Sequence, residues 1–295
     1  MQAKNIVIAI LALVLIGAVS YLLLNAGGDK TVVVDDTSTQ VEKTPVENTT
    51  NVEEVEKPLE VTAQEREAES VIGTSVDGSD IIAYHFGEGD KEILLVGGVH
   101  GSYSPNTSAL ADELISYFKN TDDAIPAGLS VTIIPDLNPD GTAKGGNEGR
   151  FNTNKVDLNR NFDCEWSETA VWRSQEVSGG SAPFSEPEAE ALRDYVDTYE
   201  PAAAIVWFSA EGKVYPSACG GTPSKSSIEL AATFATAAGY PADAEFDAYA
   251  ITGDMVNWMA DQGIPAISVL LTDYKNTELS KNKAGIEAVL KAYAE

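Results

Sequence analysis

Short aliphatic runs alternate with amphipathic segments from about residue 71 to the C-terminus. Four runs are rich in Val, Ile, Leu and Ala, as strands buried on both faces are: residues 92–96, 129–134, 202–208 and 266–271. Five segments show apolar residues at helical spacing: residues 108–119, 185–199, 227–238, 254–262 and 284–294. Strands that alternate with helices predict a mixed α/β fold, with a largely parallel sheet flanked by helices on both faces. At one helix start, Ser185 and Glu188 have the spacing of a capping box.

The N-terminal part of the chain has a different composition. Residues 6–24 form a continuous apolar run, which at about 1.5 Å per residue is long enough to cross about 30 Å of hydrocarbon. This run predicts a transmembrane helix in a membrane anchor of residues 1–28, with a cleaved signal peptide as the alternative. Residues 29–70 contain twelve acids and no aromatic residue, a composition that predicts a disordered acidic linker. Residues 71–295 are then one globular domain.

The flanking charges suggest where this domain lies. Lys4 precedes the apolar run and Asp29 follows it, which favours an N-terminus inside the cell. We therefore expect a single-pass protein of the cell membrane whose globular domain is extracytoplasmic. In such a compartment the two cysteines, Cys164 and Cys219, are expected to form a disulfide, although two free thiols are the alternative.

The strong negative charge excludes one class of partner. The chain carries 46 acidic and 19 basic residues, for a formal net charge of -27. Nucleic acids are bound through clustered Lys and Arg. We therefore expect no nucleic-acid partner.

Polar residues follow the predicted strands at one end. His100 lies shortly after the run at 92–96, Asn138 follows the run at 129–134, and Asp273 follows the run at 266–271. Since ligands of open α/β sheets bind beyond the carboxyl ends of the strands, these residues predict a single crevice there.

Several motifs near these strand ends resemble those of one enzyme family. They are GGVHGSYSPNT at 97–107, IIPDLNPDG at 133–141, VDLNRNF at 156–162, FSEPEAEALR at 184–193, YAITGDMVNWM at 249–259 and ISVLLTD at 267–273. In this order and spacing they resemble the M14 family of zinc carboxypeptidases, the carboxypeptidase A-like enzymes, and most of all their bacterial membrane-associated branch. The resemblance covers residues 80–295. It implies a carboxypeptidase fold, zinc as the cofactor and peptides as substrates.

The resemblance also implies that the catalytic centre is degenerate. Members of the family hold zinc with two histidines and one glutamate, and the first histidine matches His100. The zinc glutamate would fall at Tyr103 or Ser104, the second zinc histidine at Phe208, and the general-base glutamate at Leu270. Because two of three metal ligands and the general base are replaced, we expect no catalytic residue and at most weak zinc binding.

The residues that would bind substrate are present. The resemblance assigns Asn159 and Arg160 to the peptide's terminal carboxylate, Arg150 to the scissile carbonyl and Tyr249 to a loop that covers the bound C-terminus. An arginine can hold a carboxylate through two parallel hydrogen bonds.

Structural roles for some of these residues stay open as alternatives. Arg160 could instead pair with Asp157 or Asp163, and Tyr249 could pack within its loop. His85, on a short strand before Gly87, is expected to be structural.

Three functions remain at this point. The first is a non-catalytic domain that binds the C-terminal carboxylates of peptides or of cell-wall stem peptides. The second is an active zinc carboxypeptidase with an unusual metal site, for which His100, Glu211 and Asp273 are candidate ligands. The third is a structural relic without a ligand.

Overall fold

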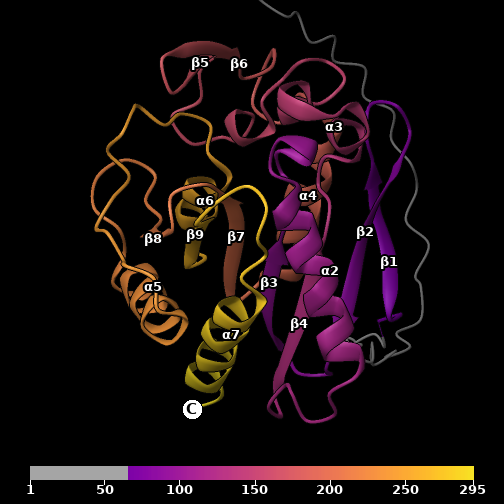
Figure 1. Ribbon diagram of the computed structural model, residues 1–295, viewed down its shortest axis with the longest axis vertical. Coiled ribbons are helices and arrows are strands. Elements are labelled where there is room, and N and C mark those ends of the chain that lie inside the picture. Colours follow the sequence, from indigo (N-terminus) through magenta and orange to yellow (C-terminus); the bar gives the residue numbers. More distant parts are fainter. Residues whose placement is uncertain (1–65) are drawn as a thin grey trace, which may run out of the picture. The chain divides into compact units, whose positions relative to one another are not determined.

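The computed structural model describes residues 66–295, which contain one seven-stranded sheet with helices on both faces (Figure 1). The strand order is β1-β2-β4-β3-β7-β9-β8. The strands are β1 (Glu69–Thr74), β2 (Asp80–Phe86), β3 (Lys91–Val96), β4 (Leu129–Ile134), β7 (Ala203–Ser209), β8 (Lys213–Pro216) and β9 (Ala266–Leu271). A separate two-stranded hairpin is formed by β5 (Thr169–Trp172) and β6 (Gln175–Ser178).

The four central strands of the large sheet run parallel. In β4-β3-β7-β9 the registers align Leu95 with Ile133 and Ile205, and Val206 with Ser268. The outer strands β1, β2 and β8 are antiparallel to their neighbours. The sheet is therefore mixed but largely parallel, as predicted. The carboxyl ends of its four central strands lie at the same edge of the sheet.

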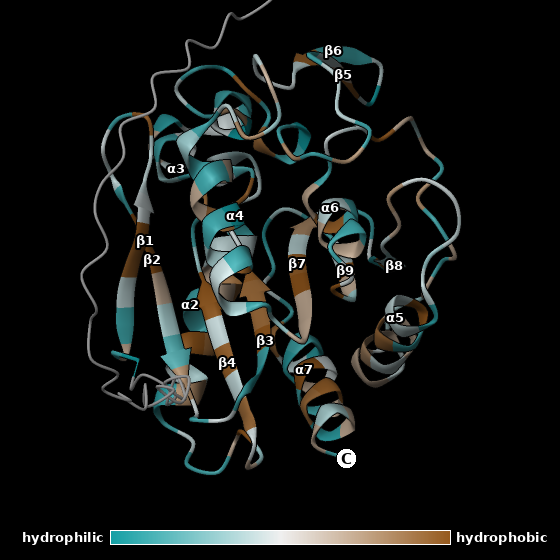
Figure 2. Ribbon diagram, turned by 180° about the vertical axis from the view of Figure 1, so that it is seen from behind, coloured by the Kyte–Doolittle hydropathy of each residue, from teal (hydrophilic) through white to brown (hydrophobic). Residues whose placement is uncertain are grey.

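Side chains of the central strands alternate between two apolar layers. Leu95 and Ile205 face the layer that α2 (Pro105–Lys119), α5 (Lys225–Ala238) and α7 (Leu279–Ala294) cover. Leu94 and Val206 face the layer beneath α4 (Pro187–Tyr199) and α6 (Met255–Asp261). Figure 2 shows the second layer from behind, with brown apolar segments along β3, β4 and β7. Strands buried on both faces explain why these runs were continuously apolar.

Two details of the helices differ from the sequence prediction. Helix α2 begins at Pro105, earlier than expected, because proline fits the first turn. The prediction of a capping box at the start of α4 is wrong, since Glu186 is the N-cap residue and its side chain makes no capping hydrogen bond. The Glu188 carboxylate instead accepts hydrogen bonds from Val76 N and Asn152 Nδ2. Tertiary partners thus replaced the local cap.

A buried polar network holds the beginning of the described chain on the sheet. Arg66 forms an ion pair with Glu92 of β3, and its guanidinium lies 3.6 Å from the ring centroid of Tyr199. Tyr195 also donates to Glu92. The structured region therefore begins slightly before residue 71, inside the segment that composition assigned to the linker.

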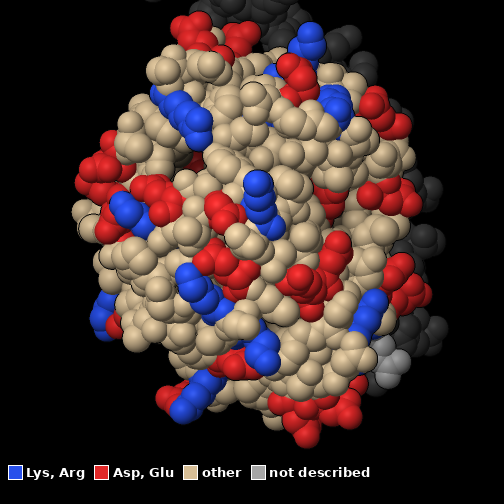
Figure 3. Space-filling view, in the orientation of Figure 1, with Lys and Arg blue, Asp and Glu red and all other residues tan. Residues whose placement is uncertain are grey.

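The expected transmembrane helix at residues 6–24 and most of the linker lie outside the described residues. Among the helices of residues 66–295, none combines the length and apolar character needed to cross a bilayer. On the face shown in Figure 3, basic side chains lie singly among acidic ones.

Candidate functional site

A cavity of about 830 Å³ opens where the central parallel strands end. The ends of β7 and β9, the β5–β6 hairpin and the loop between α5 and α6 contribute to its walls. Eight positions singled out from the sequence line it: His100, Arg150, Asn159, Arg160, Phe208, Glu211, Tyr249 and Leu270. The structure thus brings together residues that are as much as 170 positions apart in the chain.

Asp157 lies behind the cavity wall and binds two residues that line the cavity, Arg150 and His100. Its Oδ2 accepts hydrogen bonds from Nε and Nη2 of Arg150, at 3.0 and 2.7 Å. Its Oδ1 lies 3.3 Å from Nε2 of His100. All three side chains are almost fully buried. The buried carboxylate therefore fixes both the arginine and the imidazole.

This arrangement sets the charge of each group. Burial lowers the pKa of His100 to about 4, and the Arg150 guanidinium acts in the same direction. Burial favours the protonated form of Asp157, but Arg150 and the bond to His100 hold the pKa of Asp157 well below its ordinary value. At neutral pH an ionised carboxylate thus faces a neutral imidazole. Since the carboxylate can only accept, the imidazole proton lies on Nε2 and the lone pair on Nδ1.

Arg160 is buried with no carboxylate of the described chain within ion-pair distance. Its side chain is 1% exposed, and its three nitrogens donate to backbone carbonyls. Nη1 bonds to Asn159 O at 2.6 Å, while Nε and Nη2 bond to Val171 O at 3.2 and 3.1 Å. Of the five N–H groups of a guanidinium, one on each terminal nitrogen is left over. Within residues 66–295, no acid pairs with it.

The other two predicted substrate residues have different surroundings. The side-chain amide of Asn159 donates to Asp254 at 2.7 Å and accepts from Met255 N at 3.2 Å, so it ties the start of α6 to the cavity wall. Tyr249 lies on the loop before α6 and its ring packs against Phe246, with centroids 4.9 Å apart. Asn159 is therefore largely a structural link, while Tyr249 faces the cavity.

Apart from His100, the positions that the resemblance assigned to metal ligands offer neither a carboxylate nor an imidazole. The Tyr103 hydroxyl lies 2.8 Å from that of Tyr274, and Ser104 Oγ is buried without a partner. The ring of Phe208 packs against His100 with centroids 5.5 Å apart. Within the described part of the chain, no three His, Cys, Asp or Glu residues are placed to hold a metal ion.

The alternative metal set of His100, Glu211 and Asp273 is not assembled either. Glu211 forms an ion pair with Lys213 at 3.2 Å. The Asp273 carboxylate accepts from the backbone N–H of Asn276 at 2.7 Å and so closes its own turn.

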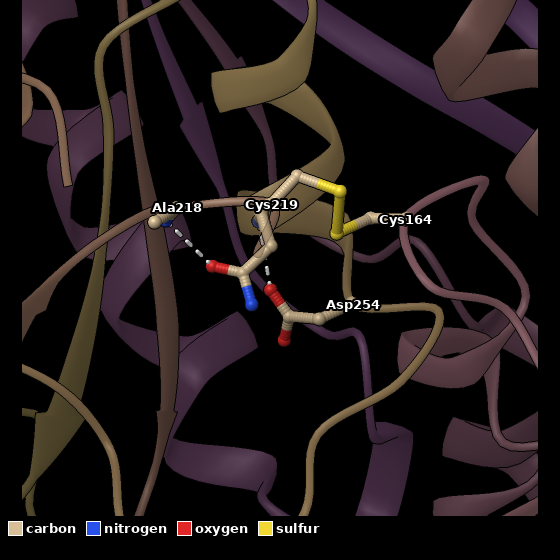
Figure 4. Close-up of a disulfide and its surroundings, with 5 residues drawn as sticks. Cys164, Ala218, Cys219 and Asp254 are labelled. Carbon is tan, nitrogen blue, oxygen red and sulfur yellow. Dashed lines mark hydrogen bonds between the residues drawn. A yellow bond between two sulfur atoms is a disulfide. The ribbon is translucent and has the colours of Figure 1, made fainter. Parts of the chain in front are cut away.

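A disulfide joins two walls of the cavity, as predicted. Cys164 and Cys219 are bonded, with Cα atoms 5.6 Å apart. Beside the bond, Asn257 of α6 accepts a hydrogen bond from Ala218 N at 3.1 Å (Figure 4). Asp254 caps the same helix by accepting from Asn257 N. The residues next to both cysteines line the cavity, so the bond fixes the spacing of its walls.

Comparison with known proteins identifies the family. A family model described as zinc carboxypeptidase matches residues 59–293, which is most of the chain. The chain belongs to the zinc carboxypeptidase family. Murein peptide amidase A of Escherichia coli K12 is 26% identical over 220 residues, covering 71% of this chain and 83% of the relative. The bacteriocin BCN5 of Clostridium perfringens is 32% identical over 137 residues, but the match spans only 15% of its length.

Solved structures share the fold of this zinc carboxypeptidase domain. A murein-tripeptide amidase from Escherichia coli O157 superposes with a TM-score of 0.60 at 21% identity, covering 78% of this chain and 93% of that one. Bovine thrombin-activatable fibrinolysis inhibitor, in complex with a tick carboxypeptidase inhibitor, gives a TM-score of 0.63 at 20% identity, covering 77% of this chain and 88% of that one. At these identities the likeness concerns the fold alone.

Zinc, which the family name implies, does not fit the residues present in this member. His100 offers one nitrogen, but Tyr103 and Phe208 give neither carboxylate nor imidazole. A dication would also lie near the buried guanidinium groups of Arg150 and Arg160, which line the same cavity. One imidazole beside two cations is a poor donor set for zinc.

Three residues that shape this domain's cavity were not predicted from the sequence. Trp172 stacks on Arg150, whose Cζ lies 4.4 Å from the ring centroid. Arg173 donates to the Tyr274 hydroxyl at 3.0 Å. Trp172 and Arg173 belong to a short hairpin of mixed polarity, and the contact with Tyr274 joins residues 101 positions apart. No local pattern could have revealed it.

Proposed function

We propose that residues 66–295 bind the C-terminal carboxylate of a peptide and do not hydrolyse it. The observation that carries this proposal is the buried Arg160 guanidinium, which lines the cavity, keeps spare N–H donors and has no acid of the described chain within ion-pair distance. A buried cation is stabilised by a counter-ion. A carboxylate from the ligand would supply it through charge-assisted hydrogen bonds, which contribute about 1.5–3 kcal/mol.

Absence of hydrolysis follows from the chemistry that the cavity lacks. Without a metal, a water molecule keeps a pKa near 16 and is a poor nucleophile. Leu270 stands where the resemblance places the general base, and it cannot accept a proton. The acids that line the cavity are Glu165, Glu211, Glu245 and Asp254. None of them stands where the resemblance places the general base, and Glu211 and Asp254 already have partners.

The ligand class follows from relatives as well as from the cavity. Murein peptide amidase A, by its name, acts on murein peptides. A cell-wall stem peptide presents the terminal carboxylate that Arg160 would bind. We therefore propose that the ligands are peptides or murein stem peptides. Binding would take place outside the membrane, with the domain anchored through residues 6–24.

One observation favours the alternative of an active zinc enzyme. His100 is neutral, its Nε2 is bound by Asp157, and its Nδ1 lone pair is left over. Metal-binding histidines are commonly oriented by such a carboxylate. A buried imidazole without a metal also needs a hydrogen-bond partner such as Asp157. The His100–Asp157 contact therefore does not outweigh the absence of the other two zinc ligands.

The test is the affinity of free-acid peptides against that of their C-terminal amides. Calorimetric titration of acetyl-Gly-Ala-Ala as acid and as amide should show at least a tenfold preference for the acid. Arg160→Gln should remove this preference, while Arg193→Gln, on the distant helix α4, should keep it. Equal affinity for acid and amide would contradict the proposal and favour a structural relic.

A further inference from the structure

A second arginine that lines the cavity has no acidic partner in the described chain. The chain has five arginines, all in the described residues. Three pair with acids: Arg66 with Glu92, Arg150 with Asp157, and Arg193 with Glu190 and Asp194. The two without an acid of the described chain in ion-pair range are Arg160 and Arg173, and both line the same cavity. Arg160 is buried and Arg173 is exposed, so in a chain with 46 acids both remain open to an anion supplied from outside.

Arg173 is held in place by aromatic side chains. It lies at the turn between β5 and β6, and its Nη2 donates to the Tyr274 hydroxyl at 3.0 Å. Its guanidinium also lies 5.4 Å from the ring centroid of Trp172. Trp172 in turn rests on the buried Arg150 and packs edge-on against Tyr103, with centroids 5.1 Å apart. The cation is therefore presented on a packed support.

The two phenols add a hydrogen-bond donor to this cation. Tyr274 Oη accepts from Arg173 and lies 2.8 Å from Tyr103 Oη. Two hydroxyls have two hydrogens, and only one is used between them, so one O–H is left whichever phenol donates. Burial and the bond to Tyr274 raise the pKa of Tyr103 to about 12, so this hydroxyl keeps its proton at neutral pH.

These donors lie where two cavities meet. A second cavity of about 730 Å³ is lined by Tyr103, Trp172, Arg173 and Tyr274, and the last three also line the main cavity. The hairpin connects the two arginines directly, because Arg160 donates to the carbonyl of Val171, two residues before Arg173. The backbone of Arg173 therefore lies within about 7 Å of the carbonyl that Arg160 binds. Because both arginines line the main cavity, a peptide bound there can contact both.

We propose that Arg173, Tyr274 and Tyr103 form a second anion subsite, which binds a carboxylate side chain of the same peptide whose C-terminus lies on Arg160. The ligand class is then a peptide with an acidic side chain in its last two residues. This rests on the proposed function and narrows it. Arginine and phenol hydrogen bonds suit a carboxylate, and Tyr103, at a position that the resemblance gives to a metal ligand, becomes part of the binding surface.

The experiment compares isosteric peptides that differ only in this charge. Acetyl-Gly-Glu-Ala is titrated against acetyl-Gly-Gln-Ala, and acetyl-Gly-Ala-Glu against acetyl-Gly-Ala-Gln, all as free acids. The wild type should prefer Glu in one of the two pairs by about tenfold, the effect of one added charge-assisted bond. Arg173→Gln should reduce that preference below about twofold. Tyr274→Phe, which keeps the ring packing, should reduce it partly, and Arg193→Gln should leave it unchanged.

Each outcome bears on the proposal. Equal affinities for Glu and Gln peptides in the wild type, together with a retained preference for acid over amide, would overturn the subsite and leave the proposed function standing. A Glu preference that survives Arg173→Gln would overturn the assignment to Arg173. Failure to bind any of these peptides would overturn both.

Discussion

Asp157 pairs with Arg150 and not with Arg160. Nε and Nη2 of Arg150 both donate to Asp157 Oδ2, at 3.0 and 2.7 Å. Arg160, in contrast, donates only to backbone carbonyls. The sequence left open that Asp157 neutralises Arg160. Because Asp157 is occupied by Arg150 and His100, the charge of Arg160 remains available to a ligand.

Asp157 should be essential to the stability of the cavity wall. Asp157→Asn removes the charge opposite the buried Arg150 and is expected to lower the free energy of unfolding by about 3–5 kcal/mol, as for other broken buried pairs. Urea denaturation monitored by circular dichroism measures this change. Asp163→Asn, an exposed neighbour, is the control and should shift stability by less than about 0.5 kcal/mol. Equal effects of the two substitutions would show that the pair is not the cause.

The disulfide should matter for both stability and binding. Cys164 and Cys219 are 55 residues apart, and closing a loop of this length stabilises the fold by about 4 kcal/mol in the chain-entropy model. The Cys164→Ser, Cys219→Ser double variant should therefore unfold at lower urea concentration. It should also bind free-acid peptides more weakly, because the covalent link between the two cavity walls is removed. Unchanged peptide affinity in the folded variant would limit the bond to a stabilising role.

His85 should make stability fall in mild acid. Its ring nitrogens lie 2.8 Å from Ser70 Oγ and 3.0 Å from Thr132 Oγ1, which agrees with the structural role expected for it. Burial, followed by the nearby Arg66, lowers the pKa of His85 from 6.5 to about 4. Between these values the unfolded chain binds a proton that the folded chain does not, so His85 destabilises the fold progressively as pH falls from 6.5 towards 4.

Comparison with His85→Gln isolates this effect from the other titrating groups. Among them, His100 acts in the same direction, whereas the pKa of Asp136, raised to about 6 by burial, acts in the opposite one. Because His85 is only partly buried and solvent screens its interactions, the stability of the wild type relative to His85→Gln should fall by roughly 1–2 kcal/mol between pH 7 and pH 4. Parallel pH profiles for the two proteins would contradict this assignment.

The central sheet could be predicted because its strands are buried on both faces. The runs at 129–134 and 266–271 coincide with β4 and β9, and their apolar character needs no knowledge of neighbours. The short strands β5, β6 and β8 were missed because they are partly exposed and mixed in polarity. Strand β1 begins at Glu69, within the segment that composition assigned to the linker, because its pairing with β2 depends on tertiary contacts.

For the candidate site, motif order located residues but could not assign their partners. Arg150, Arg160 and His100 were found, yet their contacts with Asp157 and Val171 depend on how distant loops meet. Similarly, Glu188 had the spacing of a cap, but Asn152 and Val76 were better placed to bind it. The order and spacing of the motifs therefore predicted which residues line the cavity, whereas tertiary packing determines the hydrogen-bond partner of each one.

The fate of a bound peptide decides between a binding domain and a carboxypeptidase. The wild type is incubated with excess zinc and a saturating free-acid peptide, and the mass of the recovered peptide is then measured by mass spectrometry. We expect an intact peptide after many hours, since Leu270 cannot activate water and Phe208 and Tyr103 cannot complete a zinc site. Steady loss of the C-terminal residue, abolished both by a chelator and by His100→Ala, would show instead that this domain is a working carboxypeptidase.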